Sequence, residues 1–566
     1  MLLPALPLSL VVALGDPSHA AEVDLLAAIP KDTFLAVHAP DPRGLVASRE
    51  TSSWLGFAMD PEWNSIVGPL LSVLDVDADP DEMALWRDRL FQALADANGF
   101  VAFVGDGFGD GDPVLGILAD GGPDAAALLR TLLAKDATPE TIAGGHEVHI
   151  SDEGRGELYY ERDGIILVLS TPTVEDVRGL ASECLDALGA GVPRGPFGLE
   201  GLAAQRRGAA LELAVDMSQL WAEIERVEEP TEGIESRVFD AIASFEWLYG
   251  SMTFGDGETS DMRLVAPYGE TTLLGELLAH FGAADTSLFA DVPAGMATAT
   301  VASFDVAGCT DWLMDVVEDT SEEGYEMMRS GLSAVTETVG IDVLGDFAYN
   351  ATGRFLAFSS APTDEDAPVT MSASQGTTFV MEVKETLPIV DAVEILLEMS
   401  GFGADVETES AEIPGDEDGL EVWRMAPDLA LEDVVEIGLA AGGGRLVVST
   451  NQSSFDRYIT HMGAGEGAPT LLNDPELAAA AEGAHGAMVS LQSMDEIADQ
   501  IRSMASALDD MTLELGAIDR ESGSTLSSTV DAFDRIAVLM DQYFDGIAIT
   551  ELHVADGLIR YHSRSR

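Results

Sequence analysis

The chain has 566 residues and carries 100 aspartates and glutamates against 28 lysines and arginines, a formal net charge of −72. Hydrophobic residues make up 46% of it, which excludes a charge-dominated disordered chain, and at about 150 residues per domain the length predicts about two to four domains. So negative a chain repels phosphate, which excludes a nucleic-acid partner, and the presence of only two cysteines excludes a disulfide scaffold.

The first twenty residues have the features of a secretory signal peptide. An apolar stretch from Leu2 to Leu14 is followed by Ser18 and Ala20, the small residues required at −3 and −1 of a cleavage site. Downstream we find no run of about 18 uncharged apolar residues, so we expect no membrane span. The sequence therefore predicts a secreted or periplasmic protein after cleavage of residues 1–20.

The basic residues include three lysines, Lys31, Lys135 and Lys384, and the rest are arginines. An excess of carboxylates with few lysines is typical of a surface adapted to salt, because carboxylates stay hydrated and salt screens their repulsion. A preference of the genome for arginine codons would explain the few lysines but not the net charge. We therefore expect a salt-adapted protein.

Similar landmarks occur twice along the chain, in the same order. The segment from Thr33 to Val37 leads to Asp41, and the segment from Met296 to Val301 leads to Asp305. Each reads as a short apolar strand followed by an aspartate that caps a helix. Further pairs follow in order: Gly99 to Phe103 with Arg354 to Phe358, Gly164 to Thr171 with Gly444 to Thr450, and Gly208 to Val215 with Gly486 to Leu491.

The two sets of landmarks close with predicted β-hairpins at Gly255-Asp256-Gly257 and at Asp556-Gly557. Hairpins and helices are mixed without regular βαβ alternation, so we expect the α+β class. The sequence predicts two tandem copies of one mixed hairpin-and-helix lobe after the signal peptide. We expect a first lobe over residues 21–285 and a second over residues 286–566.

The order of these landmarks resembles that of secreted bacterial proteins described as domain of unknown function 3352. Their repeats open with a proline, then a threonine or serine and a hydrophobic strand, as Ile29-Pro30-Lys31-Asp32-Thr33 does here. The second copy departs from this pattern, because the segment from Val292 to Met296 lacks the threonine. The resemblance implies secretion and a repeated architecture. The family has no assigned reaction, so it implies no functional residue.

Signals for catalysis are absent. We find no Gly-x-Ser-x-Gly segment of a hydrolase nucleophile. Cys184 and Cys309 read as buried free thiols, with a disulfide between the halves as the alternative. His146 and His149 lack the spacing of zinc ligands on a helix, and residues three apart on a strand point to opposite faces, so we expect two surface histidines.

Two acidic segments cluster the hard oxygen ligands that calcium prefers, although the first lacks the glycine and the distal glutamate of an EF-hand. In so acidic a chain such clusters also arise by chance, so we expect solvated loops, with calcium as the alternative cofactor. The candidate metal ligands are Asp75, Asp77, Asp79, Asp81, Glu82, Asp106, Asp110 and Asp112.

The sequence favours a protein without catalysis that has a binding or structural role in the cell envelope, where its partner is a ligand or an envelope protein. One alternative is a periplasmic hydrolase whose site comes from distant residues, with a carboxylate or histidine pair of perturbed pKa. The other is a calcium-dependent adhesion or matrix protein.

Overall fold

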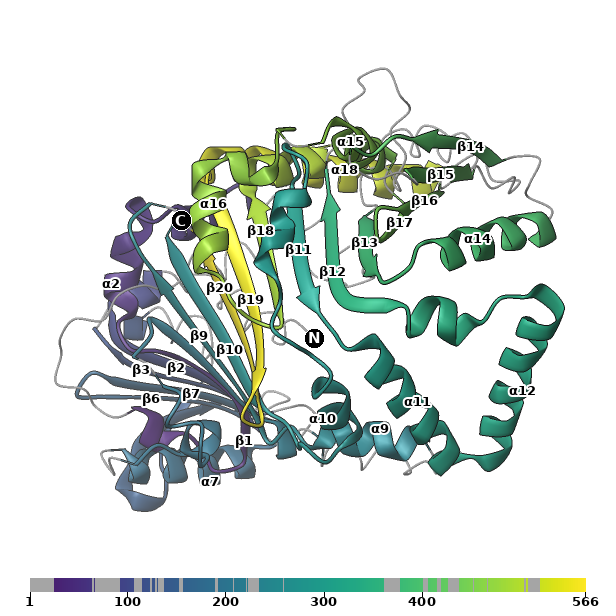
Figure 1. Ribbon diagram of the computed structural model, residues 1–566. Coiled ribbons are helices and arrows are strands. Elements are labelled where there is room, and N and C mark those ends of the chain that lie inside the picture. The colour runs from purple at the N-terminus through teal and green to yellow at the C-terminus, as the bar shows by residue number, and fades with distance from the viewer. Residues whose placement is uncertain are drawn as a thin grey trace. The chain divides into compact units, whose positions relative to one another are not determined.

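The computed structural model describes the chain from residue 25 to residue 565 with gaps (Figure 1). The gaps are 64–65, 67–91, 106–113, 123–124, 128–129, 131–136, 152–155, 189–191, 207, 220, 222–233, 258, 361–376, 401–405, 415–418, 426–436, 451, 466, 503–504 and 507–519. The predicted signal peptide at 1–20 lies outside the described residues.

The chain forms two compact units, residues 1–272 together with 557–566, and residues 273–556. The division falls after Thr272 instead of at the expected 285/286. The last ten residues return to the first unit because their strand pairs there with the strand from Ser260 to Pro267. Both units combine helices with antiparallel strands, which confirms the predicted mixed α+β class.

The strands of the first unit pair with one another in antiparallel fashion throughout. Their order across the sheet is β4 (Thr138–Thr141), β5 (Glu147–Ser151), β6 (Gly156–Arg162), β7 (Ile165–Thr171), β3 (Val114–Gly121), β2 (Ala97–Gly105), β1 (Thr33–Ala39), β8 (Leu211–Asp216), β9 (Trp247–Phe254), β10 (Ser260–Pro267) and β20 (Leu558–Ser565).

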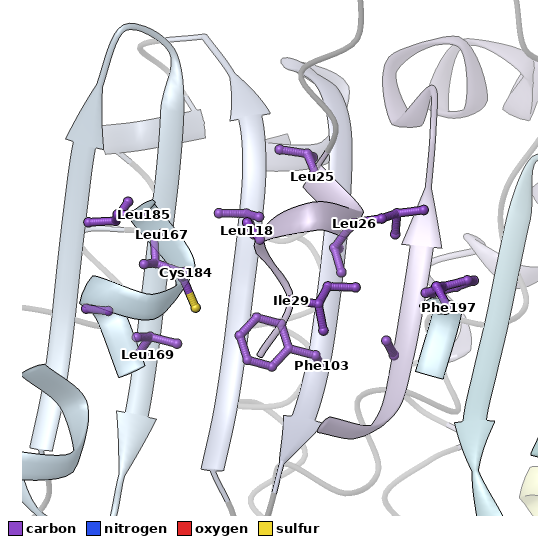
Figure 2. Close-up of a cluster of buried hydrophobic side chains, with 14 of the residues drawn as sticks. Leu25, Leu26, Ile29, Phe103, Leu118, Leu167, Leu169, Cys184, Leu185 and Phe197 are labelled. Atoms are coloured by element: carbon purple, nitrogen blue, oxygen red, sulfur yellow. The ribbon is translucent and has the colours of Figure 1, made fainter. Parts of the chain in front are cut away.

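Helices cover both faces of this sheet. Their bounds are η1 (Leu25–Ala28), α2 (Pro42–Ala47), η2 (Ser48–Glu50), α3 (Ser53–Ala58), η3 (Ala143–Gly145), α7 (Val174–Ala187), η4 (Gly195–Gly198) and α9 (Ile234–Ala243). Strand residues alternate between two cores. Val101 and Leu118 enter the core that lies against α7, η1 and η4. We call this side of the sheet the α7 face, and Figure 2 shows Leu118 there. Phe100 and Ala119 enter the core on the opposite face, with side chains of α2 and α3.

Local sequence explains several boundaries. Asp41 caps α2 by accepting a hydrogen bond from the backbone N–H of Gly44 at 2.8 Å, and Asp305 caps α11 (Val306–Thr320) through Gly308 at 3.0 Å. Both caps were predicted. The turn between β6 and β7 places Asp163 and Gly164 at φ 53° and 85°, the left-handed conformations of a two-residue hairpin that Asp-Gly favours.

The strands of the second unit are also antiparallel. Their order is β14 (Val406–Ala411), β15 (Leu420–Met425), β16 (Ile437–Gly442), β17 (Arg445–Ser449), β13 (Thr378–Val383), β12 (Ala351–Ser359), β11 (Thr298–Ser303), β18 (Met488–Ser493) and β19 (Ile547–Ala555).

The second unit also has a core on each face of its sheet. Besides α11, the helices are α10 (Leu273–Leu278), η5 (Thr286–Asp291), α12 (Glu322–Val339), η6 (Val343–Ala348), α14 (Leu387–Ser400), α15 (Gln452–Ala464), η8 (Leu471–Asn473), α16 (Pro475–Gly483) and α18 (Arg520–Tyr543). The larger core joins Val301 and Leu356 of the strands to Phe455 of α15. The smaller core joins Trp423 to Ile389 of α14.

Candidate functional site

The predicted calcium ligands lie outside the described residues. They are Asp75, Asp77, Asp79, Asp81, Glu82, Asp106, Asp110 and Asp112. Within the part of the chain that the structure describes, no group of three or more histidine, cysteine, aspartate or glutamate side chains could hold a metal ion.

The two histidines considered as zinc ligands do not converge. His146 Nε2 lies 3.0 Å from Asp186 Oδ1, and its ring is 6.1 Å from that of Tyr160. His149 lies 6.4 Å from the ring of Tyr159, the neighbouring residue whose side chain enters the opposite core. The histidines therefore contact tyrosines on opposite faces of the sheet.

Both cysteines are free thiols. Cys184 lies on α7 and is completely buried in the core that Figure 2 draws, beside Leu167 and Leu185. Burial raises the pKa of its thiol to about 12, so the reactive thiolate is scarce near neutral pH. Cys309 is half-buried on α11, and burial also raises its pKa. Burial thus opposes thiolate formation at both cysteines, which makes neither a good nucleophile.

Strand register in the first unit creates a row of polar side chains that the sequence analysis did not predict. His38 pairs with Val101 on one side and with Glu212 on the other. Directly paired residues point to the same face of a sheet, so the row lies on the α7 face. It continues from Glu212 through the next three strands. We call it the polar row: His38, Glu212, Ser251, Arg263 and His562.

Glu212 is the centre of a hydrogen-bonded cluster. Its side chain is 1% exposed, and its carboxylate lies 2.9 Å from His38 Nδ1. Arg206 donates to both carboxylate oxygens, from Nε at 3.0 Å and from Nη2 at 2.6 Å, and the Tyr249 hydroxyl donates at 2.9 Å. The carboxylate is fully hydrogen-bonded, as a buried charge must be to persist in a core.

An aromatic side chain closes the cluster. The Phe197 ring of η4 meets the His38 ring edge-on at 6.0 Å, and the Arg206 guanidinium lies 5.3 Å from the centroid of the same Phe197 ring. This arrangement packs one aromatic ring against both side chains that contact Glu212, the His38 ring and the Arg206 guanidinium. It brings together β1, β8, β9 and the segment before β8.

The cluster holds Glu212 as an anion. Burial by itself raises the pKa of Glu212, but the hydrogen bonds and charges of His38 and Arg206 outweigh burial and hold the pKa at about 2. For Tyr249, burial and the adjacent carboxylate raise the pKa. Neither Glu212 nor Tyr249 exchanges protons near neutral pH, so neither is suited to general acid or base catalysis.

His38 is held as the histidine of a hydrolase would be, with one ring nitrogen bound to a carboxylate. Its other nitrogen, Nε2, has no hydrogen-bond partner among the described residues, so no serine, threonine or cysteine is attached to it. The pair is therefore oriented but has no nucleophile in the part of the chain that the structure describes.

We expect acid to remove the contribution of Glu212 to stability. Its pKa lies at about 2 in the folded chain, against an ordinary value of 4.5. A lowered carboxylate pKa stabilises the fold above about pH 4.5, and this stability is lost as the pH falls through about 2. The contribution is about 3 kcal/mol. The stability difference between wild type and Glu212→Gln should therefore shrink by about this amount between pH 6 and pH 2, measured by urea unfolding. A constant difference would contradict the assignment.

Comparisons of the chain with protein-family models, curated proteins and solved structures find no match. The resemblance to domain of unknown function 3352 therefore stays an expectation. Among the described residues, no helix is both long and apolar enough to cross a membrane.

Proposed function

We propose that this chain is a secreted or periplasmic protein of the cell envelope that binds a ligand without catalysis. We further propose that it consists of two copies of one lobe and that only the first copy carries the binding residues. The resemblance described above, the signal-like first twenty residues and the chemistry of the cluster around Glu212 support this proposal.

Strand order supports the duplication. From one edge inward, the first unit runs β4-β5-β6-β7-β3-β2-β1-β8-β9, and the second runs β14-β15-β16-β17-β13-β12-β11-β18-β19. The segments Ile165 to Leu169 and Leu446 to Val448 lie in corresponding strands, β7 and β17. The two units thus differ in sequence but share one pairing order.

One observation carries the functional proposal: corresponding positions in the two sheets differ in polarity. Val101 of β2 and Leu356 of β12 hold the same position in the matched segments Gly99 to Phe103 and Arg354 to Phe358. Next to them across the sheet stand His38 and Glu212 in the first unit, and Val301 and Val489 in the second.

The second unit therefore fills these positions with hydrocarbon, and both valines lie in its larger core. A sheet with this pairing order therefore does not require charged residues at these two positions. Burying charges costs free energy that packing hydrocarbon does not. We therefore propose that ligand binding, and not a requirement of the sheet, explains why the first unit has charged residues at these positions.

The hydrolase alternative has one observation in its favour, the His38–Glu212 pair. Against it, the lowered pKa of Glu212 and the absence of a nucleophile on His38 among the described residues favour binding. Export followed by an activity assay tests both proposals. The precursor is expressed in a Gram-negative host, and the mature protein is recovered from the periplasm or medium.

We expect the mature chain to begin at Ala21 and to show no turnover of ester, phosphoester, glycoside or peptide substrates that depends on His38. The variants compared are His38→Val and, as control, His146→Val, which removes another histidine paired with a carboxylate. Turnover lost in the folded His38→Val variant and kept in the control would establish the hydrolase instead. Retention of the uncut chain in the cytoplasm would contradict the proposed location.

A further inference from the structure

Strands β10 and β20 lie side by side (Figure 1), and their paired residues gather arginines on the α7 face of the first unit. His562 of β20 stands opposite Arg263 of β10, Arg564 stands opposite Asp261, and Arg560 stands opposite Val265. Val265 belongs to the α7-face core, so the side chains paired with it and with its alternate neighbours point to that face. We call Arg263, Arg560 and Arg564 the arginine strip.

The strip concentrates positive charge within an acidic chain. The two strands carry three arginines against one aspartate, whereas the whole chain carries a net charge of −72. A chain this negative repels anions at long range, so an anion is held only where cations are concentrated at short range. Diagonal neighbours such as Arg263 and Arg560 lie about 7–8 Å apart at the start of their side chains, which lets both guanidinium groups reach one oxyanion.

Asp261, the aspartate beside the arginine strip, already has hydrogen-bond partners. Arg263 donates to the Asp261 carboxylate from Nε at 2.9 Å and from Nη2 at 3.1 Å, and His562 Nε2 lies 3.0 Å from the same carboxylate. Burial raises the pKa of Asp261, but the hydrogen bonds of His562 and Arg263 outweigh it and lower the pKa, so this side chain stays an anion.

Two donor groups of the strip remain without a partner among the described residues. Arg263 uses Nε and Nη2 on Asp261, which leaves its Nη1, and its side chain is 44% exposed. Arg560 makes no ion pair or hydrogen bond with any residue that the structure describes. Adjacent guanidinium groups repel each other, and a bound anion would relieve that repulsion.

We propose that the arginine strip binds an oxyanion, the carboxylate or phosphate group of a ligand, between the Arg560 guanidinium and Nη1 of Arg263. The planar guanidinium presents paired N–H donors that match two oxygens of such a group. Asp261 and His562 position Arg263 for this contact. The inference rests on the proposed binding role and names the chemical class of the ligand.

Titration calorimetry with inorganic phosphate and with acetate tests this proposal, at constant ionic strength set with NaCl. We expect saturable phosphate binding to wild type and at least a tenfold weaker affinity for Arg560→Gln. Arg560→Lys keeps the positive charge but lacks the paired N–H donors of the guanidinium, so its phosphate affinity should lie between those of wild type and Arg560→Gln. The control is Arg162→Gln, which removes a 67% exposed arginine on β6 and should leave the affinity within twofold.

Binding of phosphate alone supports a phosphate-bearing ligand, and binding of both probes supports a ligand with either group. The proposal is wrong if wild type binds neither probe saturably, or if Arg560→Gln binds phosphate as tightly as wild type. Those results leave the proposed binding role open to another ligand. Conversely, His38-dependent turnover would overturn the proposed function and leave a phosphate site on the strip intact.

Discussion

Replacing Glu212 by valine should lower the free energy of unfolding by about 3–5 kcal/mol, the cost of breaking a buried ion pair by removing one partner. The substitution leaves the guanidinium of Arg206, the ring of His38 and the hydroxyl of Tyr249 without their acceptor inside the core. Urea unfolding of the wild type and the variant measures the difference.

Glu140 provides a matched control. Its carboxylate accepts two hydrogen bonds from Arg178, both at 2.9 Å, but the two side chains are 40% and 43% exposed. Exposed pairs contribute about 0–1 kcal/mol because water and ions screen them, so Glu140→Val should cost little. Equal costs at the two sites would contradict the importance of burial at Glu212.

A combined variant distinguishes the cost of leaving one partner of the ion pair alone from the effect of replacing all its partners by apolar side chains. Changing His38 and Glu212 to valine copies Val301 and Val489 of the second unit, and Arg206→Met removes the guanidinium that would otherwise lose its carboxylate partner. Replacing a buried ion pair by apolar side chains is often neutral or stabilising, so this variant should regain most of the stability lost in Glu212→Val. Failure to regain it would mean that the first unit needs these charges to fold.

The melting temperature should rise with NaCl concentration. A net charge of −72 places many carboxylates within the Debye length of about 8 Å at 0.15 M ionic strength, and unfolding relieves their repulsion. At about 1 M salt the Debye length is about 3 Å, which removes most of this penalty. Each kcal/mol recovered raises the melting temperature by about 2–4 °C for domains of a few hundred residues.

Melting curves at about 0.02 M and 1 M NaCl decide this prediction, and a flat or falling midpoint contradicts it. A second series of melting curves with added calcium tests the acidic segments from Asp75 to Glu82 and from Asp106 to Asp112. Calcium should raise the midpoint at far lower concentration than NaCl only if one of these segments forms a specific site. Equal effects of calcium and magnesium at the same ionic strength would reject such a site.

Much of the fold could be predicted from short stretches of sequence. The caps Asp41 and Asp305 and the strands from Thr33 and from Gly164 are recognisable because residues a few positions apart determine them. The return of the last strand to the first unit could not be predicted, because pairing β20 with β10 joins residues about 300 positions apart.

The candidate site was less accessible to sequence reasoning than the fold. His38 and Glu212 each interrupt an apolar strand, and a polar residue at a buried strand position is the signal that could have marked them. Arg560 and Arg564, two arginines close together near the end of an acidic chain, are likewise visible in the sequence. Neither signal says which residue lies opposite each of these side chains on the neighbouring strand.

The sequence by itself determined the charge of this protein, its mixed α+β class and its local caps and turns, because composition and short-range geometry are sufficient for these. Only the tertiary structure decided that His38 meets Glu212, 174 residues away, and that Arg263 lies beside Arg560. Register is the physical reason. A slip of one residue between β1 and β8 would turn either side chain to the opposite face, and nothing near His38 in the chain encodes that choice.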